Sequence, residues 1–181
     1  WVSELCARAL IFSHWLCGVT SFSVACLESE VEGTGIEVVP AKSNPIDAVW
    51  SDQPSPSDAA AIAHDSERAG RSSSEKRAQV AEWLEAEKLD AVVVPALDSI
   101  AWLLNIRGGD VSHSPVALSY VIAKADGTAE LFIAPEKVTP ELTQHLGNAV
   151  TIRDRDAFEG ALKADYAGQR GSVDPNFGVV G

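Results

Sequence analysis

Residues 72–95, SSSEKRAQVAEWLEAEKLDAVVVP, contain a helix start, an amphipathic helix and an apolar strand in succession. Ser72 and Glu75 have the spacing of a capping box, which satisfies free backbone N–H groups at a helix N-terminus. An apolar stripe at helical spacing follows, at Val80, Trp83 and Leu84. The run 91–94 is apolar at every position, as in a strand that is covered on both faces. The stretch predicts a helix over 72–88, then a strand, and hence the start of an α/β sandwich.

The chain beyond residue 97 alternates helix and strand patterns. Two β-rich runs are joined by Ala-Asp-Gly-Thr at 125–128, and Asp-Gly between such runs is a strong hairpin signal that makes them antiparallel neighbours. Helix starts are indicated by Asp98, by Thr139 before Pro140, and by Asp156 with Glu159. The predicted elements are helices over 98–105, 139–147 and 156–166 and strands over 116–124, 129–134, 150–152 and 172–174. This order predicts an α/β fold with a mixed β-sheet flanked by helices on both faces.

The first 71 residues differ in character from the remainder. Serine and proline are dense over 51–72, which predicts a linker and a domain boundary, and a short strand is expected over 35–39. Residues 1–34 are interpreted as a foreign or frame-shifted leader, with a secretory signal over 1–26 or a native helix as alternatives. With no methionine in the chain and no closing element before Gly181, we expect a fragment at both ends. The expected parts are a leader at 1–34, the end of a first domain with its linker at 35–71, and a second, C-terminally truncated domain at 72–181.

Charge and cysteine usage restrict the compartment and the partners. The chain has 26 acidic and 14 basic residues among 181, and its formal net charge of -12 repels nucleic acid and anionic membrane surfaces. All three cysteines lie within the first 26 residues and lack zinc-ligand spacing, so everything after Cys26 folds without disulfides. We therefore expect a cytoplasmic protein that binds neither nucleic acid nor membrane, or an exported one if residues 1–26 are a signal.

Clustered catalytic groups are not apparent in the sequence. The four histidines stand in four different contexts, without a second histidine or paired carboxylate at metal-ligand spacing: His14, His64, His113 and His145. No Gly-x-Ser-x-Gly elbow is present, and the pair Gly108-Gly109 lacks the lysine and hydroxyl residue of a phosphate loop. We predict no catalytic or metal-binding residue in this chain.

One polar stretch is a candidate binding site: Asn105-Ile106-Arg107-Gly108-Gly109-Asp110, followed by His113 and Pro115. Groups of both charges around glycines, between a helix and a hydrophobic strand, are typical of a loop at a cleft mouth or a domain interface. The alternative is a bend whose glycines take positive φ and whose Arg107 pairs with Asp110 for local order.

At these residues the sequence resembles the second domain of the large, three-domain aminopeptidase P enzymes. The string from Asp98 to Val116 carries the resemblance, and the stretch Asn44-Pro45-Ile46-Asp47-Ala48-Val49-Trp50 resembles the connector between the first and second domains. The likeness covers roughly residues 36–181. It implies a creatinase-like N-terminal fold in an enzyme that removes the N-terminal residue preceding proline. In that family, two metal ions, usually manganese, are held by a C-terminal pita-bread domain, which would begin after Gly181.

The resemblance transfers no catalytic or metal residue to this chain. It implies a non-catalytic domain whose loop residues Asn105, Arg107, Asp110 and His113 face the catalytic domain, at the substrate entrance or the interdomain contact. The partners implied are that catalytic domain and peptides of the X-Pro type, in a parent enzyme that could be a homodimer. The alternative is a free-standing module that uses the loop from Arg107 to His113 to bind a peptide or a protein.

Overall fold

The computed structural model describes residues 31–37, 49–52, 55 and 57–173. The chain divides into two compact units, one of Trp1–Ser55 with Pro175–Gly181 and one of Pro56–Asp174. We call the second unit the domain. In the first unit the prediction of a strand over 35–39 is wrong for its described part, because Gly35 lies in a turn with a φ of 74° and residues 36–37 are not in a strand. The end of that predicted strand and most of the predicted leader lie outside the described residues.

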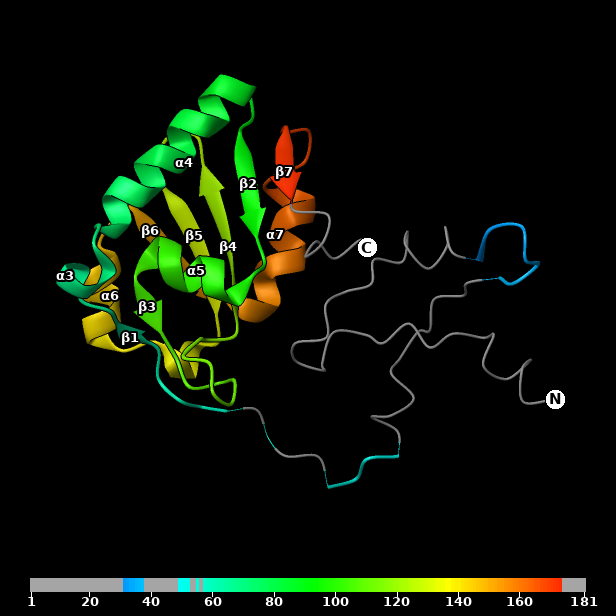
Figure 1. Cartoon of the computed structure of the whole chain (residues 1–181), viewed down its shortest axis with the longest axis horizontal. Coiled ribbons are helices and arrows are strands. Elements are labelled where there is room, and N and C mark those ends of the chain that lie inside the picture. Colours follow the sequence, from blue (N-terminus) through cyan, green and yellow to red (C-terminus); the bar gives the residue numbers. More distant parts are fainter. Residues whose placement is uncertain (1–30, 38–48, 53–54, 56, 174–181) are drawn as a thin grey trace. The chain divides into compact units, whose positions relative to one another are not determined.

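Five strands form the central sheet of the domain, in the order β6-β5-β4-β2-β7 (Figure 1). Strand β4 runs antiparallel to both β2 and β5, whereas β6 is parallel to β5 and β7 is parallel to β2. The predicted mixed sheet is therefore confirmed, including the antiparallel hairpin around Gly127, whose φ is 79°. The strand bounds are β2 Ala91–Val94, β4 Ser119–Lys124, β5 Ala129–Ile133, β6 Val150–Asp154 and β7 Gly171–Val173.

Helices cover both faces of this sheet. One face packs against α4 (Ser73–Glu87), α5 (Leu97–Leu104) and α6 (Pro140–Leu146), and the other packs against α7 (Phe158–Ala164). Single 3-10 turns precede α6 and α7, at η1 (Pro135–Lys137) and η2 (Arg155–Ala157). The order of elements from residue 72 follows the predicted one, apart from these turns and a short strand after α5.

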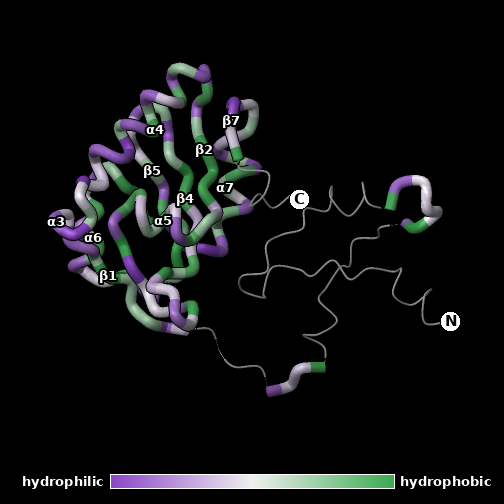
Figure 2. The backbone as a smooth tube through the Cα atoms, in the orientation of Figure 1, coloured by the Kyte–Doolittle hydropathy of each residue, from purple (hydrophilic) through white to green (hydrophobic). Residues whose placement is uncertain are grey.

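Side chains of the central strands alternate between two apolar cores. In β4, Val121 and Ala123 belong to the core under α4, α5 and α6, whereas Tyr120 and Ile122 belong to the core under α7. Strand β5 alternates in the same way, with Leu131 and Ile133 on the first side and Phe132 on the second. Figure 2 shows β2 and β4 as largely hydrophobic, in contrast to α3. Side chains alternate between the two faces along each strand, and both faces are covered, which explains why these runs are mainly apolar.

The observed helix N-caps confirm two of the predicted capping residues and contradict two others. The capping box of Ser72 and Glu75 at α4 is confirmed, and so is the Thr139 cap of α6, whose Oγ1 accepts a hydrogen bond from Leu142 N. The prediction of Asp98 as the N-cap is wrong, because α5 begins at Leu97, with Ala96 as its N-cap and Asp98 in its first turn. Asp156 does not cap α7 either, since η2 comes first and is capped by Asp154.

The predicted linker contains regular structure next to the sheet. Within it lie β1 (Ile62–Ala63) and α3 (Ser66–Ala69), and β1 pairs antiparallel with β3 (Ile106–Arg107) in a separate two-stranded sheet. Ala61 is completely buried in the first core, and its N–H donates to Lys137 O at 3.0 Å. Residues 57–71 therefore pack as part of the domain. The division of the chain at residue 72 stays a prediction.

Candidate functional site

Asn105, the first residue of the candidate loop, is buried at the C-terminus of α5. It takes a left-handed conformation, with a φ of 51°, and ends the helix. Its Oδ1 accepts a hydrogen bond from Lys76 Nζ at 2.6 Å, and its Nδ2 donates to Arg71 O at 2.8 Å. His64 N donates to the Asn105 carbonyl at 2.8 Å. Asparagine tolerates the left-handed backbone conformation because its side-chain amide can form local hydrogen bonds. Through these contacts Asn105 connects α5, α4 and the β1 segment, and its side chain is not available at the surface.

Basic side chains from three elements satisfy the last carbonyls of α5. Arg107 NH1 donates to Ala101 O at 3.0 Å and to Ile106 O at 2.8 Å, and Lys76 Nζ donates to Trp102 O at 2.9 Å. His145 Nε2 lies 3.0 Å from Leu104 O. Cations at a helix C-terminus are favourable because the carbonyl dipoles make that end negative. Burial lowers the pKa of Lys76, and nearby Arg107 and Arg71 lower it further.

Residues 108–116 form a short hairpin, which we call the 108–116 loop. Gly108 N donates to Pro115 O and Asp110 N donates to Val116 O, each at 3.2 Å. Val111 and Ser114 form an isolated antiparallel bridge, and residues 111–114 make the tip of the loop.

The predicted positive φ of Gly108 and Gly109 is wrong. Neither glycine is among those with positive φ, whereas His113 at the tip has a φ of 63°. Gly108 is required for a different reason, since a Cβ there would lie 2.7 Å from Ala117 Cβ and 2.8 Å from the Ala117 backbone. The two legs of the hairpin thus approach each other more closely than any side chain permits.

Asp110 makes a buried ion pair with a residue that the sequence analysis did not identify. Asp110 Oδ2 lies 2.5 Å from Lys137 Nζ, and the two side chains are 0% and 3% exposed. The same oxygen accepts a hydrogen bond from Leu118 N at 2.6 Å. The alternative pairing of Arg107 with Asp110 is therefore wrong, because Arg107 is bound to the carbonyls of Ala101 and Ile106, and Asp110 to Lys137 of η1. The segment Pro-Glu-Lys-Val around Lys137 carries no motif that could have indicated this contact.

The four candidate residues therefore do not converge on one point. Asn105, Arg107 and Asp110 form contacts inside the domain, and His113 is exposed at the tip together with Ser112 and Ser114. The part of the loop that a ligand or a partner can contact is its small, exposed tip, which carries the imidazole of His113. The charged residues that mark the loop in sequence fix its position.

A second polar group lies on the α7 side of the sheet. Glu130 of β5 accepts hydrogen bonds from Lys124 Nζ at 2.6 Å and from Arg153 NH1 at 2.9 Å. Burial raises the pKa of the Glu130 carboxyl, but the hydrogen bonds of Lys124 and Arg153 outweigh it, and the pKa lies below its ordinary value. Arg153 also binds Asp165 at 2.7 Å. Each charge in this group is paired, as a structural ion network requires.

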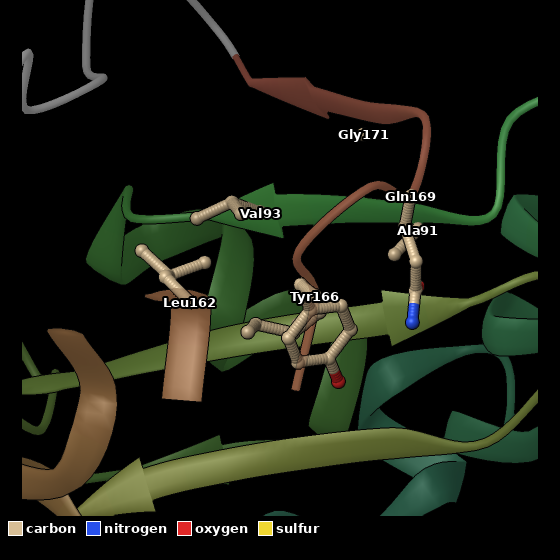
Figure 3. A pocket seen from close by; sticks show the side chains of 7 residues that line it. Ala91, Val93, Leu162, Tyr166, Gln169 and Gly171 are labelled. Carbon is tan, nitrogen blue, oxygen red and sulfur yellow. The ribbon is translucent and has the colours of Figure 1, made fainter. Parts of the chain in front are cut away.

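A shallow pocket of about 190 Å³ lies beside this network, between the α7–β7 connection and the sheet (Figure 3). Apolar side chains make most of its wall, and Tyr166 and Gln169 contribute its polar atoms. The lining residues are Ala91, Val93, Ile122, Leu162, Tyr166, Gln169 and Gly171. No nucleophile with an adjacent base lies among them, so the pocket suggests no reaction.

Within residues 31–37, 49–52, 55 and 57–173, no group of three or more His, Cys, Asp or Glu side chains could hold a metal ion. His64, His113 and His145 belong to separate environments there, as their backbone and side-chain contacts show. None of the helices described is both long and apolar enough to cross a membrane.

The sheet order, the two cores and the position of the loop define a mixed α/β domain with an exposed hairpin tip. The family model of the Creatinase/Prolidase N-terminal domain matches residues 52–176, and the chain belongs to this family. The resemblance stated from the sequence is thereby confirmed.

Several similar proteins are named as Xaa-Pro aminopeptidases. The "Probable Xaa-Pro aminopeptidase P" of Aspergillus niger is 35% identical over 147 residues, which are 81% of this chain and 24% of that protein. Its counterpart in Aspergillus clavatus is 36% identical over 141 residues, 77% of this chain and 21% of that protein. The chain spans about a quarter of the length of such relatives or less.

A solved structure supports the same relationship. The X-prolyl aminopeptidase of Caenorhabditis elegans, described as a cytosolic enzyme with a di-nuclear active site, matches with a TM-score of 0.71 and 26% identity. The match covers 83% of this chain and 25% of that chain. The creatinase-like N-terminal fold implied by the sequence is confirmed.

Proposed function

We propose that this chain is a non-catalytic N-terminal domain of an Xaa-Pro aminopeptidase, in which it supports domain packing and shapes substrate access. The parent enzyme removes the N-terminal residue that precedes proline in a peptide. Its chemistry belongs to a C-terminal pita-bread domain with two divalent metal ions, manganese by family resemblance. The parent is a cytoplasmic enzyme and a homodimer in this proposal.

The observation that carries the proposal is the set of contacts by which Arg107 and Asp110 hold the 108–116 loop on the domain. Arg107 and Asp110 bind α5 and Lys137 inside the domain, and the exposed tip that they support presents His113. A loop on a rigid scaffold is the usual place for a binding contact, because the scaffold reduces the entropy that is lost on binding. The described residues do not fit a resident metal site, and we assign them no step of the peptide cleavage.

The test uses the full-length protein that contains this chain, assayed on an Ala-Pro peptide and on the matched Ala-Ala peptide with added divalent metal. We expect release of the N-terminal alanine from the first peptide only. His113→Ala should raise KM by about 3- to 10-fold and leave kcat within about twofold, because the tip contributes to binding and not to the bond that breaks.

His64→Ala provides a matched control outside the loop and should leave KM unchanged. Arg107→Ala should lower the thermal stability, since the guanidinium serves the carboxyl end of α5. Equal cleavage of both peptides would contradict the proposed activity. Normal kinetics in His113→Ala would contradict the binding role of the tip but not the proposed activity.

A further inference from the structure

We propose that Lys137 is a positioning residue of the 108–116 loop and acts through the buried carboxylate of Asp110. This inference rests on the proposed function, because it adds a residue to the same entrance loop. It concerns a side chain that lies outside the loop in sequence and contacts it only in the fold.

Lys137 joins three parts of the domain at one point. It ends η1, which directly follows the buried strand β5. Its backbone carbonyl accepts a hydrogen bond from Ala61 N at 3.0 Å, and its Nζ lies 2.5 Å from Asp110 Oδ2. The backbone of Lys137 is held by the β1 segment and by β5, and its side chain is buried. The ammonium group therefore contacts the loop from a well-anchored part of the domain.

The Asp110 carboxylate connects both legs of the loop to that point. Asp110 belongs to the first leg, and its Oδ2 accepts from Leu118 N, just beyond the second leg, at 2.6 Å. The pair is excluded from water, with 0% and 3% of the two side chains exposed. A charged hydrogen bond in such surroundings is stronger and more directional than one at the surface.

The tip depends on this support because its own contacts are local. Among the described residues, Ser114 bonds only to Val111 and Val116 within the loop, and no hydrogen bond joins Ser112 or His113 to another element. The direction in which His113 points is therefore set by the two legs. Loss of the Lys137 contact should let the legs move and should spread the tip over several orientations.

The experiment measures the loop directly and through catalysis, in the full-length enzyme. In Lys137→Met, hydrogen exchange of the Gly108 and Asp110 amides should rise about tenfold or more, while exchange in β4 and β5 stays slow. KM for the Ala-Pro peptide should rise several-fold, with kcat within about twofold of wild type. Lys124→Met is the matched control, since it breaks another lysine–carboxylate pair on the α7 side and should leave loop exchange unchanged.

A second variant separates positioning from stability. Lys137→Met alone leaves a buried, unpaired carboxylate, whereas Lys137→Met with Asp110→Asn removes both charges. In the double variant the midpoint of denaturation should recover, while loop exchange and KM stay raised. Asp110→Asn alone, which keeps an acceptor for Leu118 N–H, provides the same readouts if Lys137→Met does not fold.

Each outcome decides one point. Unchanged loop exchange in Lys137→Met would overturn the positioning role, whatever the kinetics. Raised exchange with unchanged KM would overturn the link between the loop and the substrate. In both cases wild-type cleavage of the Ala-Pro peptide, measured in the same assay, shows separately whether the proposed function holds.

Discussion

At the scale of single residues, the carboxyl end of α5 shows what the polar side chains of the loop do. Lys76, Arg107 and His145 reach Trp102 O, Ala101 O and Leu104 O, respectively. Buried carbonyl groups at a helix end are costly unless a donor satisfies them, and here the donors come from three elements, of which those of Lys76 and His145 are distant in sequence. The basic residues near the loop are consequently part of the packing of α5.

Glu130 provides a pH-dependent test at the same scale. Its pKa lies below the ordinary value of 4.5, because hydrogen bonds from Lys124 and Arg153 outweigh the effect of burial. A carboxyl with a lowered folded-state pKa stabilises the fold above its unfolded-state pKa, and the stabilisation is lost as pH falls through the folded-state value. We expect Glu130→Gln to lower the free energy of unfolding by about 1–2 kcal/mol at pH 7.

The measurement is urea denaturation of wild type and Glu130→Gln from pH 7 downward. The difference between them should shrink once the pH falls below the ordinary glutamate value of 4.5. Glu159→Gln, on the exposed side of α7, is the control and should change little at any pH. A difference that stays constant down to pH 3 would show that the carboxylate charge of Glu130 does not stabilise the domain.

At the scale of elements, the close approach between Gly108 of the 108–116 loop and Ala117 predicts a strong effect of one methyl group. Gly108→Ala would place a Cβ 2.7 Å from Ala117 Cβ and 2.8 Å from Ala117 N and Cα. Backbone cannot move aside as a flexible side chain can, so we expect a loss of about 1–3 kcal/mol in the free energy of unfolding, measured by urea denaturation.

Two further variants distinguish the close approach from a general intolerance of alanine. Gly109→Ala places its Cβ 3.3 Å from Ala59 Cβ and should be mild by comparison. Ala117→Gly should rescue Gly108→Ala only in part, because the backbone contacts of residue 117 remain. Full rescue, or equal effects of the two glycine substitutions, would contradict this explanation of Gly108.

The elements that the sequence predicts correctly are those determined by local patterns. The capping box of α4, the Asp-Gly hairpin and the apolar runs of β2, β4 and β5 each depend on neighbours within a few residues. The two strands it missed depend on distant partners. β1 and β3 are two residues long and exist because they pair with each other.

The candidate site follows the same division. The loop was found because its composition differs from that of its neighbours, and its internal contacts were not found because Lys137 lies 27 positions from Asp110 in a segment without a motif. The sequence predicts positive φ at the glycines of the loop, but positive φ occurs at His113, where the tip turns. Gly108 is instead needed because the chain passes close to Ala117. Local composition thus located the loop, but three-dimensional contacts determine its shape.

At the scale of the whole molecule, the central sheet of the domain has a core on each side, and both cores are made from residues after position 60. The first core contains side chains from Ala61 to Val150, and the second contains residues from Ala91 to Tyr166. A unit that buries its own apolar side chains in this way can be stable alone. The contribution of residues 57–71 then decides where a stable unit can begin.

That boundary is open to a direct test with two truncated forms, one starting at residue 56 and one at the predicted boundary, residue 72. The shorter form loses the completely buried Ala61, the β1–β3 pairing and the hydrogen bonds from Ala61 N to Lys137 O and from His64 N to Asn105 O. It also leaves those two carbonyls without their donors. We expect the form starting at residue 72 to be less stable by about 2–4 kcal/mol than the form starting at residue 56.

Trp83 and Trp102 lie in both truncated forms, so their fluorescence during urea denaturation can report unfolding in each. The 181-residue chain is the reference, and the form starting at residue 56 should match the midpoint of its domain transition, because Pro56–Asp174 is a compact unit. Equal stability of the two truncated forms would instead support the boundary at residue 72. In that case residues 57–71 would be a segment that follows the surface of the domain without stabilising it, and Lys137 would keep its position without the hydrogen bond from Ala61.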